Sequence, residues 1–128
     1  MEGLNAWAVL AATLGSFALG AIWYSPALFL PTWAREARVN KPAGSPGVYV
    51  VLFLLSLLAA AAFAWLIGPR ASLGMALAKG LAVGVCFVAT SFWVNYTFAN
   101  RGMTLWAIDA GYHVTRFLLF GLILGLWH

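Results

Sequence analysis

Four apolar stretches, each long enough to cross a membrane as a helix, occupy nearly all of this 128-residue chain. A membrane-spanning helix needs about 20 mostly apolar residues. With 64% apolar and only 8% charged residues, the chain carries more apolar surface than one small water-soluble core can bury. We therefore expect transmembrane spans at about residues 5–23, 48–67, 73–98 and 105–127.

These spans predict an all-α membrane protein whose four transmembrane helices form an antiparallel bundle. Backbone groups that face lipid must pair within their own segment, which excludes open strands. The links after the second and third spans are short, so successive helices are expected to be antiparallel neighbours. Gly80-xxx-Gly84 and Gly121-xxx-Gly125 fit the motif by which such helices associate. Residues 1–128 are expected to form a single integral membrane domain.

The first loop is expected to contain a short helix of its own. Pro31 suits the first turn of a helix. Trp33 and the nearby arginines suit a membrane surface, so we predict a short interfacial helix here. A proline- and glycine-rich stretch at residues 40–47 then predicts a flexible link to the second span.

The basic residues between the spans predict the orientation. Loops that remain in the cytoplasm carry an excess of lysine and arginine. The first and third loops hold the larger share of these residues: Arg35, Arg38, Lys41 and Arg101, against Arg70 and Lys79 around the second loop. Loops one and three are therefore expected in the cytoplasm, with both termini outside.

The fourth span contains a stripe of polar side chains at helical spacing. Its members are Asp109, Tyr112, His113 and Arg116. Residues three and four apart share one face of a helix. Ionisable groups are costly in hydrocarbon, so such a stripe indicates a functional site. Because helical side chains lean toward the N-terminus, Arg116 is expected to reach back toward Asp109.

A second polar line is expected to face this stripe from the third span. It consists of Lys79, Cys86, Thr90, Trp93, Thr97 and Asn100, with Ser91 and Asn95 on the adjoining face. Trp23 and Tyr24 arrive at the same depth from the end of the first span. We therefore predict a polar pocket near the cytoplasmic side, between the first, third and fourth spans. Its candidate ligand-binding residues are Asp109, Tyr112, His113, Arg116, Asn95, Asn100, Trp23 and Tyr24.

Each candidate also has a simpler structural interpretation. Tryptophans and tyrosines at span ends fit an aromatic belt at the membrane surface. Pro26 can simply end the first helix, and Asn95 and Asn100 can form hydrogen bonds between helices. The charged stripe of the fourth span can be an internal ion-paired network that fixes the register of the helices.

The chain lacks the sequence signs of most catalytic chemistries. There is no glycine-rich phosphate loop, no His-Glu-x-x-His motif and no nucleophile elbow. Two histidines and one aspartate do not make a convincing zinc site, and a haem ligand would have to be His113 alone. We expect no catalytic residue, no metal and no cofactor. The basic residues are few and scattered, so the net charge of +4 does not indicate a nucleic-acid partner.

Two segments carry a resemblance to a known family. Residues 20–29 read Gly-Ala-Ile-Trp-Tyr-Ser-Pro-Ala-Leu-Phe and are followed by Trp33. This resembles the opening motif of the domain of unknown function 1761 family, small bacterial membrane proteins of four helices. Residues 108–112 and the glycine-rich end are similar as well. The resemblance implies a multi-pass protein of the bacterial inner membrane and no established activity. It gives weight to the motif Trp23, Tyr24, Ser25 and Pro26.

The charges inside the spans do not balance. Arg116 and Lys79 stand against Asp109 alone. An uncompensated buried cation is expensive, so the imbalance calls for a bound anion, a lipid phosphate or a carboxylate from another subunit.

Three classes of function follow. The first is binding or permeation of a small anionic or proton-coupled solute, with Arg116 as charge selector and Asp109 with His113 as a proton-exchange pair. The second is a structural or regulatory membrane protein whose stripe binds lipid head groups or a partner helix. The third is an integral-membrane enzyme or haem-type site that uses His113 and Tyr112. We expect the first, in a homo-oligomer embedded in the lipid bilayer.

Overall fold

The computed structural model describes residues 4–39 and 45–127. Residues 40–44, which hold Lys41 and most of the predicted flexible link, lie outside the described part, as does His128. The described residues form helices and no strand. The helices are α1 (Ala6–Trp23), α2 (Leu30–Ala37), α3 (Pro46–Ile67), α4 (Leu73–Ala82), the π-helix η1 (Val83–Ala89), α5 (Thr90–Phe98) and α6 (Met103–Leu126).

Four helical rods are long and apolar enough to cross a membrane. They are α1, α3, the continuous rod of α4, η1 and α5, and α6. Their bounds lie within two residues of the predicted spans, so the prediction of an all-helical chain with four such helices is confirmed. Side chains fix where three of them begin, because Asn5, Ser45 and Ser72 each accept hydrogen bonds from N–H groups of the first turn.

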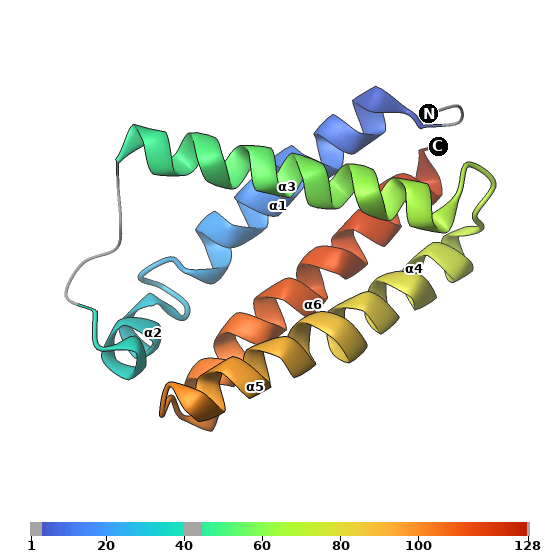
Figure 1. Ribbon diagram of the computed structural model, residues 1–128. Helices are drawn as coiled ribbons and strands as arrows, with labels where there is room; N and C mark the ends of the chain where they lie inside the picture. The colour runs from blue at the N-terminus through green and yellow to red at the C-terminus, as the bar shows by residue number, and fades with distance from the viewer. Residues whose placement is uncertain (1–3, 40–44, 128) are drawn as a thin grey trace.

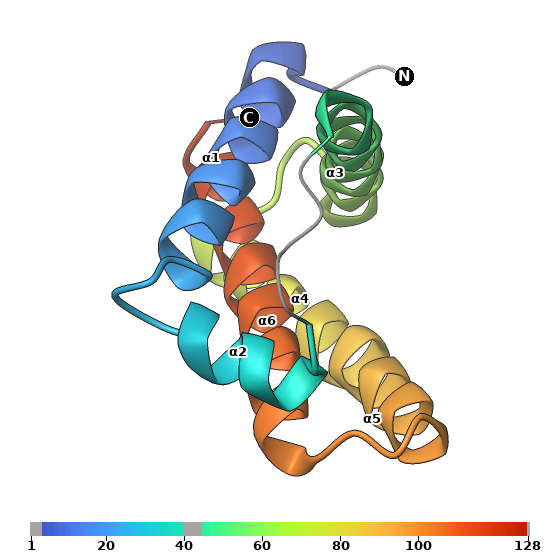
Figure 2. The same ribbon diagram turned by 90° about the vertical axis from the view of Figure 1, so that its left-hand side faces the viewer.

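Helix α6 lies at the centre of the arrangement. Helix α1 packs along one side of it and the α4–η1–α5 rod along another (Figure 1). Helix α3 crosses α1 and approaches α6 only near the end where both termini lie, as the turned view in Figure 2 also shows. The short helix α2 lies at the opposite end, against α6.

Glycines bring α4 and α6 into backbone contact. A Cβ atom at Gly80 would lie 2.5 Å from the carbonyl oxygen of Phe117, and one at Gly121 would lie 2.6 Å from that of Ala76. Both distances are too short for any side chain, so only glycine fits at these two positions. The Gly80-xxx-Gly84 motif therefore packs against α6, and the Gly121-xxx-Gly125 motif packs against α4, as such motifs do in membrane proteins.

The π-helix η1 lies in this contact with α6. Gly84 lies against the backbone of Val114, where a Cβ would be 2.8 Å from the Val114 Cα. A π-turn leaves a carbonyl without its usual α-helical partner. Nearby side chains supply donors: the indole Nε1 of Trp106 donates to the carbonyl of Ala89 at 2.9 Å, and the hydroxyl of Ser91 donates to that of Phe87 at 2.5 Å.

Most of the polar line of the third span does not face α6. Its members Cys86, Thr90, Trp93, Thr97 and Asn100 are exposed, as are Ser91 and Asn95, while Lys79 is half-buried. Trp93 packs edge-on against Trp106 of α6, with ring centres 5.0 Å apart. Apart from this contact, the expected orientation is wrong for the exposed residues. The reason is steric: the glycines at 80 and 84 must face α6 for the backbones to touch, which turns the polar line outward.

Candidate functional site

Asp109 joins three helices through its carboxylate. It lies on α6, is 8% exposed, and accepts a hydrogen bond at Oδ1 from the hydroxyl of Tyr24 at 2.5 Å. Its other oxygen accepts one from the hydroxyl of Tyr96 on α5. Tyr24 is the residue that caps the end of α1. Bonds to an ionised acceptor are stronger than neutral ones, so Asp109 holds the ends of α1 and α5 against α6.

The Tyr24 hydroxyl is kept as a donor by its surroundings. It lies just beyond the membrane-length helix α1, in a largely buried position. Burial raises the pKa of Tyr24 above its ordinary value, and the hydrogen bond to Asp109 raises it further. The phenol therefore stays protonated at any physiological pH and continues to donate to the carboxylate.

The Trp-Tyr-Ser-Pro motif places Tyr24 at this point. The indole Nε1 of Trp23 donates to the carbonyl of Ile108 at 2.9 Å, which anchors the end of α1 one residue before Asp109. The carbonyl of Ser25 then accepts from the N–H of Leu28, and α1 cannot continue through Pro26. The result is a compact turn that ends α1 and leads α2 back to α6.

Arg116 forms a second polar centre near the middle of α6. Its side chain is 9% exposed. Nη1 lies 3.4 Å from Nδ1 of His113, and Cζ lies 5.7 and 5.2 Å from the ring centres of Phe117 and Phe120. Its Nε is buried without a hydrogen-bond partner. Within the described residues no carboxylate lies within 4.0 Å of the guanidinium. Arg116 therefore does not reach Asp109 as expected.

Aromatic rings pack around Tyr112 and His113, which lie along α6 between Asp109 and Arg116. The Tyr112 ring packs edge-on against Tyr24 and His113, with ring centres 5.5 and 4.9 Å away, and its hydroxyl donates to the carbonyl of Ser16 on α1 at 3.1 Å. Phe92 of α5 stacks on His113 at 5.1 Å. The four residues of the stripe thus lie on one side of α6, but Asp109 and His113 are not in direct contact through a hydrogen bond.

Asn95 and Asn100 are not brought to either centre. Both are exposed, and Asn100 takes a left-handed backbone conformation (φ 57°) in the turn after α5. The tyrosine that does reach Asp109 from this helix, Tyr96, was absent from the sequence candidates. One signal could have found it, because residues at every fourth position along α4, η1 and α5 continue the line of packing glycines: Gly80, Gly84, Val88, Phe92 and Tyr96.

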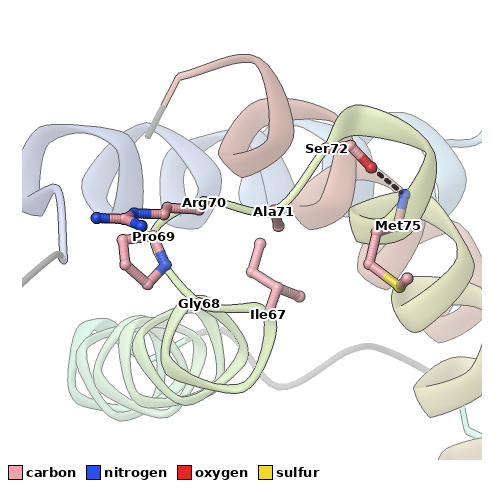
Figure 3. A pocket seen from close by; sticks show the side chains of 7 residues that line it. All are labelled: Ile67, Gly68, Pro69, Arg70, Ala71, Ser72 and Met75. Atoms are coloured by element: carbon pink, nitrogen blue, oxygen red, sulfur yellow. Dashed lines mark hydrogen bonds between the residues drawn. The ribbon is translucent and has the colours of Figure 1, made fainter.

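Two of the hollows on the surface of the described chain lie at turns between helices. The wider one is shallow and lies between the end of α3 and the start of α4 (Figure 3). It is lined by Ile67, Gly68, Pro69, Arg70, Ala71, Ser72 and Met75. In Figure 1 this turn lies at the opposite end of the helices from the α5–α6 turn beside Asp109. It therefore belongs to the connection between helices and not to the polar stripe.

The second hollow is about 40 Å³, enough for only a few water molecules. Its lining is Trp93, Tyr96, Thr97, Arg101, Gly102, Met103 and Trp106. Through Tyr96 it adjoins the Asp109 centre at the turn between α5 and α6. Among the described residues no group of three His, Cys, Asp or Glu side chains gathers to hold a metal ion.

Comparison with known proteins gives one match. The profile of the family described as protein of unknown function (DUF1761) matches residues 7–125, which confirms the resemblance carried by the Trp-Tyr-Ser-Pro motif. No curated protein and no solved structure matches the chain.

Proposed function

Because this chain belongs to the DUF1761 family, whose function is unknown, we propose a function from its own residues: binding of a small monovalent anion beside Arg116, as a step in its permeation across the membrane. The observation that carries the proposal is the buried guanidinium of Arg116, which has an unpaired Nε and no carboxylate nearby.

The proposal places the four long helices antiparallel across the bacterial inner membrane. Figure 1 supports this arrangement, since both termini lie at one end and the turns after α1 and α5 at the other. Arg35, Arg38 and Arg101 belong to that second end, which we assign to the cytoplasm. Helix α2 then lies at the membrane surface, with Arg35 exposed and Trp33 packed edge-on against Tyr24 at 6.0 Å.

Arg116 lies too deep for lipid head groups to neutralise it. At 1.5 Å per residue, it stands about 20 Å from the Met103 end of α6 and about 15 Å from the Leu126 end. An arginine side chain cannot span either distance, so snorkelling to a phosphate would require the bilayer itself to deform. A counter-ion at this depth must come from within the protein or from a dissolved anion.

The described acidic residues do not supply that counter-ion. They are Glu36 and Asp109. Asp109 is already bonded to two tyrosines, and Glu36 lies on α2 at the end of the molecule. A second copy in the same orientation repeats these depths, so neither of these carboxylates is placed at Arg116. A dissolved anion is left.

The chemistry around Arg116 selects the kind of anion. One guanidinium can neutralise one negative charge, and its neighbours are an imidazole and two phenyl rings. A divalent anion would keep an uncompensated charge in a region with few other hydrogen-bond donors, which is costly. Chloride, nitrate or thiocyanate therefore suits the site better than sulfate or phosphate.

Asp109 serves the assembly of this site in our proposal. Its two tyrosine bonds hold α1 and α5 on either side of α6, and so fix the walls around His113 and Arg116. The proton-exchange pair expected from the sequence is not part of the proposal, because the carboxylate of Asp109 accepts hydrogen bonds from Tyr24 and Tyr96 and forms none with His113.

Anion flux into liposomes that contain the purified protein tests the proposal. We expect chloride and nitrate flux above that of empty liposomes, lost in Arg116→Leu and partly kept in Arg116→Lys, which preserves the charge. The matched control is Arg70→Leu, which removes an exposed arginine from the α3–α4 turn. Flux equal to that of empty liposomes for every anion, or unchanged flux in Arg116→Leu, would refute it.

A further inference from the structure

A broad line of polar side chains, spread over two adjoining faces of the third span, has no counterpart within the chain. It comprises Cys86 and Thr90 on one face and Ser91 and Asn95 on the next, all exposed on η1 and α5. The function proposed above does not use these residues. In a helix of membrane length, this surface faces either lipid or another protein.

The hydroxyls in this line are satisfied locally, but the amide is not. Thr90 donates to the carbonyl of Cys86 at 2.8 Å, and Ser91 donates to that of Phe87. Asn95 has no hydrogen-bond partner for its side chain among residues 4–39 and 45–127. An amide carries two donors and an acceptor, and lipid tails offer it no partner. Where the bilayer covers it, the Asn95 amide therefore needs a polar partner from outside the chain.

We propose that this surface, Cys86 to Asn95, packs against the same surface of a second copy of the chain. Copies inserted in the same orientation and related by a two-fold axis along the membrane normal place equal residues at equal depth. The Asn95 amide is both donor and acceptor, so it can pair with its own equivalent. The line has no charged residue, and therefore the two copies meet without repulsion.

The other large exposed surface differs in the way expected of a lipid contact. Helix α3 exposes mostly apolar side chains, among them Val50, Leu54, Leu55 and Leu58, with Tyr49 near one end of the helix and Trp65 near the other. Lipid satisfies such a surface without a protein partner. This contrast favours η1 and α5 as the contact with a second copy and α3 as the contact with lipid. The inference does not depend on whether Arg116 binds an anion.

Oxidative cross-linking in native membranes tests the contact with the protein as it exists. Cys86 is the one cysteine of the chain and lies in the proposed surface. Two cysteines form a disulfide only when their Cβ atoms come within about 4 Å. Copper-phenanthroline should therefore give a covalent dimer that is lost in Cys86→Ala. The control is Cys86→Ala with Leu55→Cys, which moves the thiol to the exposed surface of α3. Equal or stronger cross-linking of that control would overturn the proposal.

The Asn95 contribution is measured separately by single-molecule photobleaching of labelled protein in dilute vesicles. Two symmetric bonds of the strength found between membrane helices imply that Asn95→Leu weakens dimerisation about tenfold. Asn100→Gly is the control, because it removes the other exposed amide at a left-handed position that glycine tolerates. Asn95 is exposed, so its substitution should leave the helical circular dichroism unchanged. A monomeric wild-type protein, or an unchanged dimer fraction in Asn95→Leu, would refute the contact.

Discussion

The two tyrosine bonds to Asp109 make a graded prediction about stability. Tyr24→Phe removes one hydroxyl and keeps the ring contacts with Trp33 and Tyr112. A hydrogen bond to a charged group contributes about 1.5–3 kcal/mol. The matched control is Tyr112→Phe, which removes a neutral bond to a backbone carbonyl at 3.1 Å. Such bonds between membrane helices contribute about 0.6 kcal/mol.

The predicted difference is large enough to measure. At about 4 °C per kcal/mol for a chain of this size, Tyr24→Phe should lower Tm by roughly 6–12 °C and Tyr112→Phe by only roughly 2–3 °C. Thermal unfolding in detergent, followed by circular dichroism, gives both values. Tyr96→Phe should resemble Tyr24→Phe, since it donates to the other carboxylate oxygen.

The double variant sharpens the test. With both phenols removed, the buried carboxylate loses both of its donors, so the combined loss should exceed the sum of the single losses. If Tyr24→Phe and Tyr96→Phe cost no more than Tyr112→Phe, and the losses simply add, then Asp109 does not hold the three helices together as described.

Two further predictions concern the contact between α6 and the third span. Gly80→Ala should destabilise the protein by about 1–3 kcal/mol, because the new Cβ would lie 2.5 Å from the carbonyl oxygen of Phe117. The control is Gly74→Ala, which should be neutral or stabilising because its Cβ meets nothing within 4 Å. Equal unfolding temperatures for the two variants would contradict the close approach of the helices. Trp106→Phe should lower the free energy of unfolding by about 1 kcal/mol and speed the hydrogen exchange of backbone amides around η1, because it leaves the carbonyl of Ala89 without its indole donor. Amide exchange that stays at the wild-type rate would argue against this role of Trp106.

Hydropathy and depth were enough to predict much of this fold. The lengths of the apolar stretches gave four membrane-length helices within two residues of their bounds. Depth in the membrane predicted that Trp23 and Tyr24 would lie near Asp109. The first span ends at the same membrane surface at which the fourth span begins, so these residues lie at the same level. Both predictions depend on distance along a helix axis, which sequence position determines directly.

The rotation of each helix about its axis was harder to predict. The polar line of the third span was expected to face α6, but backbone contact at Gly80 and Gly84 requires the glycine face to point inward. That same face delivers Tyr96 to Asp109. A periodic pattern shows which residues share a face, and it does not show which neighbour that face meets.

The separation of Asp109 from Arg116 depends on side-chain packing. Helical spacing put both residues on one stripe. It could not show that Asp109 would bond to Tyr24 and Tyr96, or that Tyr112 would bond to the carbonyl of Ser16. The choice among side-chain rotamers depends on contacts with α1 and α5. The consequence for function is direct, because a guanidinium without its expected carboxylate becomes a site for a dissolved anion.

Bromide located by anomalous scattering in crystals grown from a lipid phase tests the central claim most directly. The account predicts a bromide peak within hydrogen-bonding distance of the Arg116 guanidinium, beside His113, and its loss in Arg116→Leu crystals of the same form. A guanidinium paired with a carboxylate, or one without any bromide while bromide binds elsewhere in the same crystal, would contradict it.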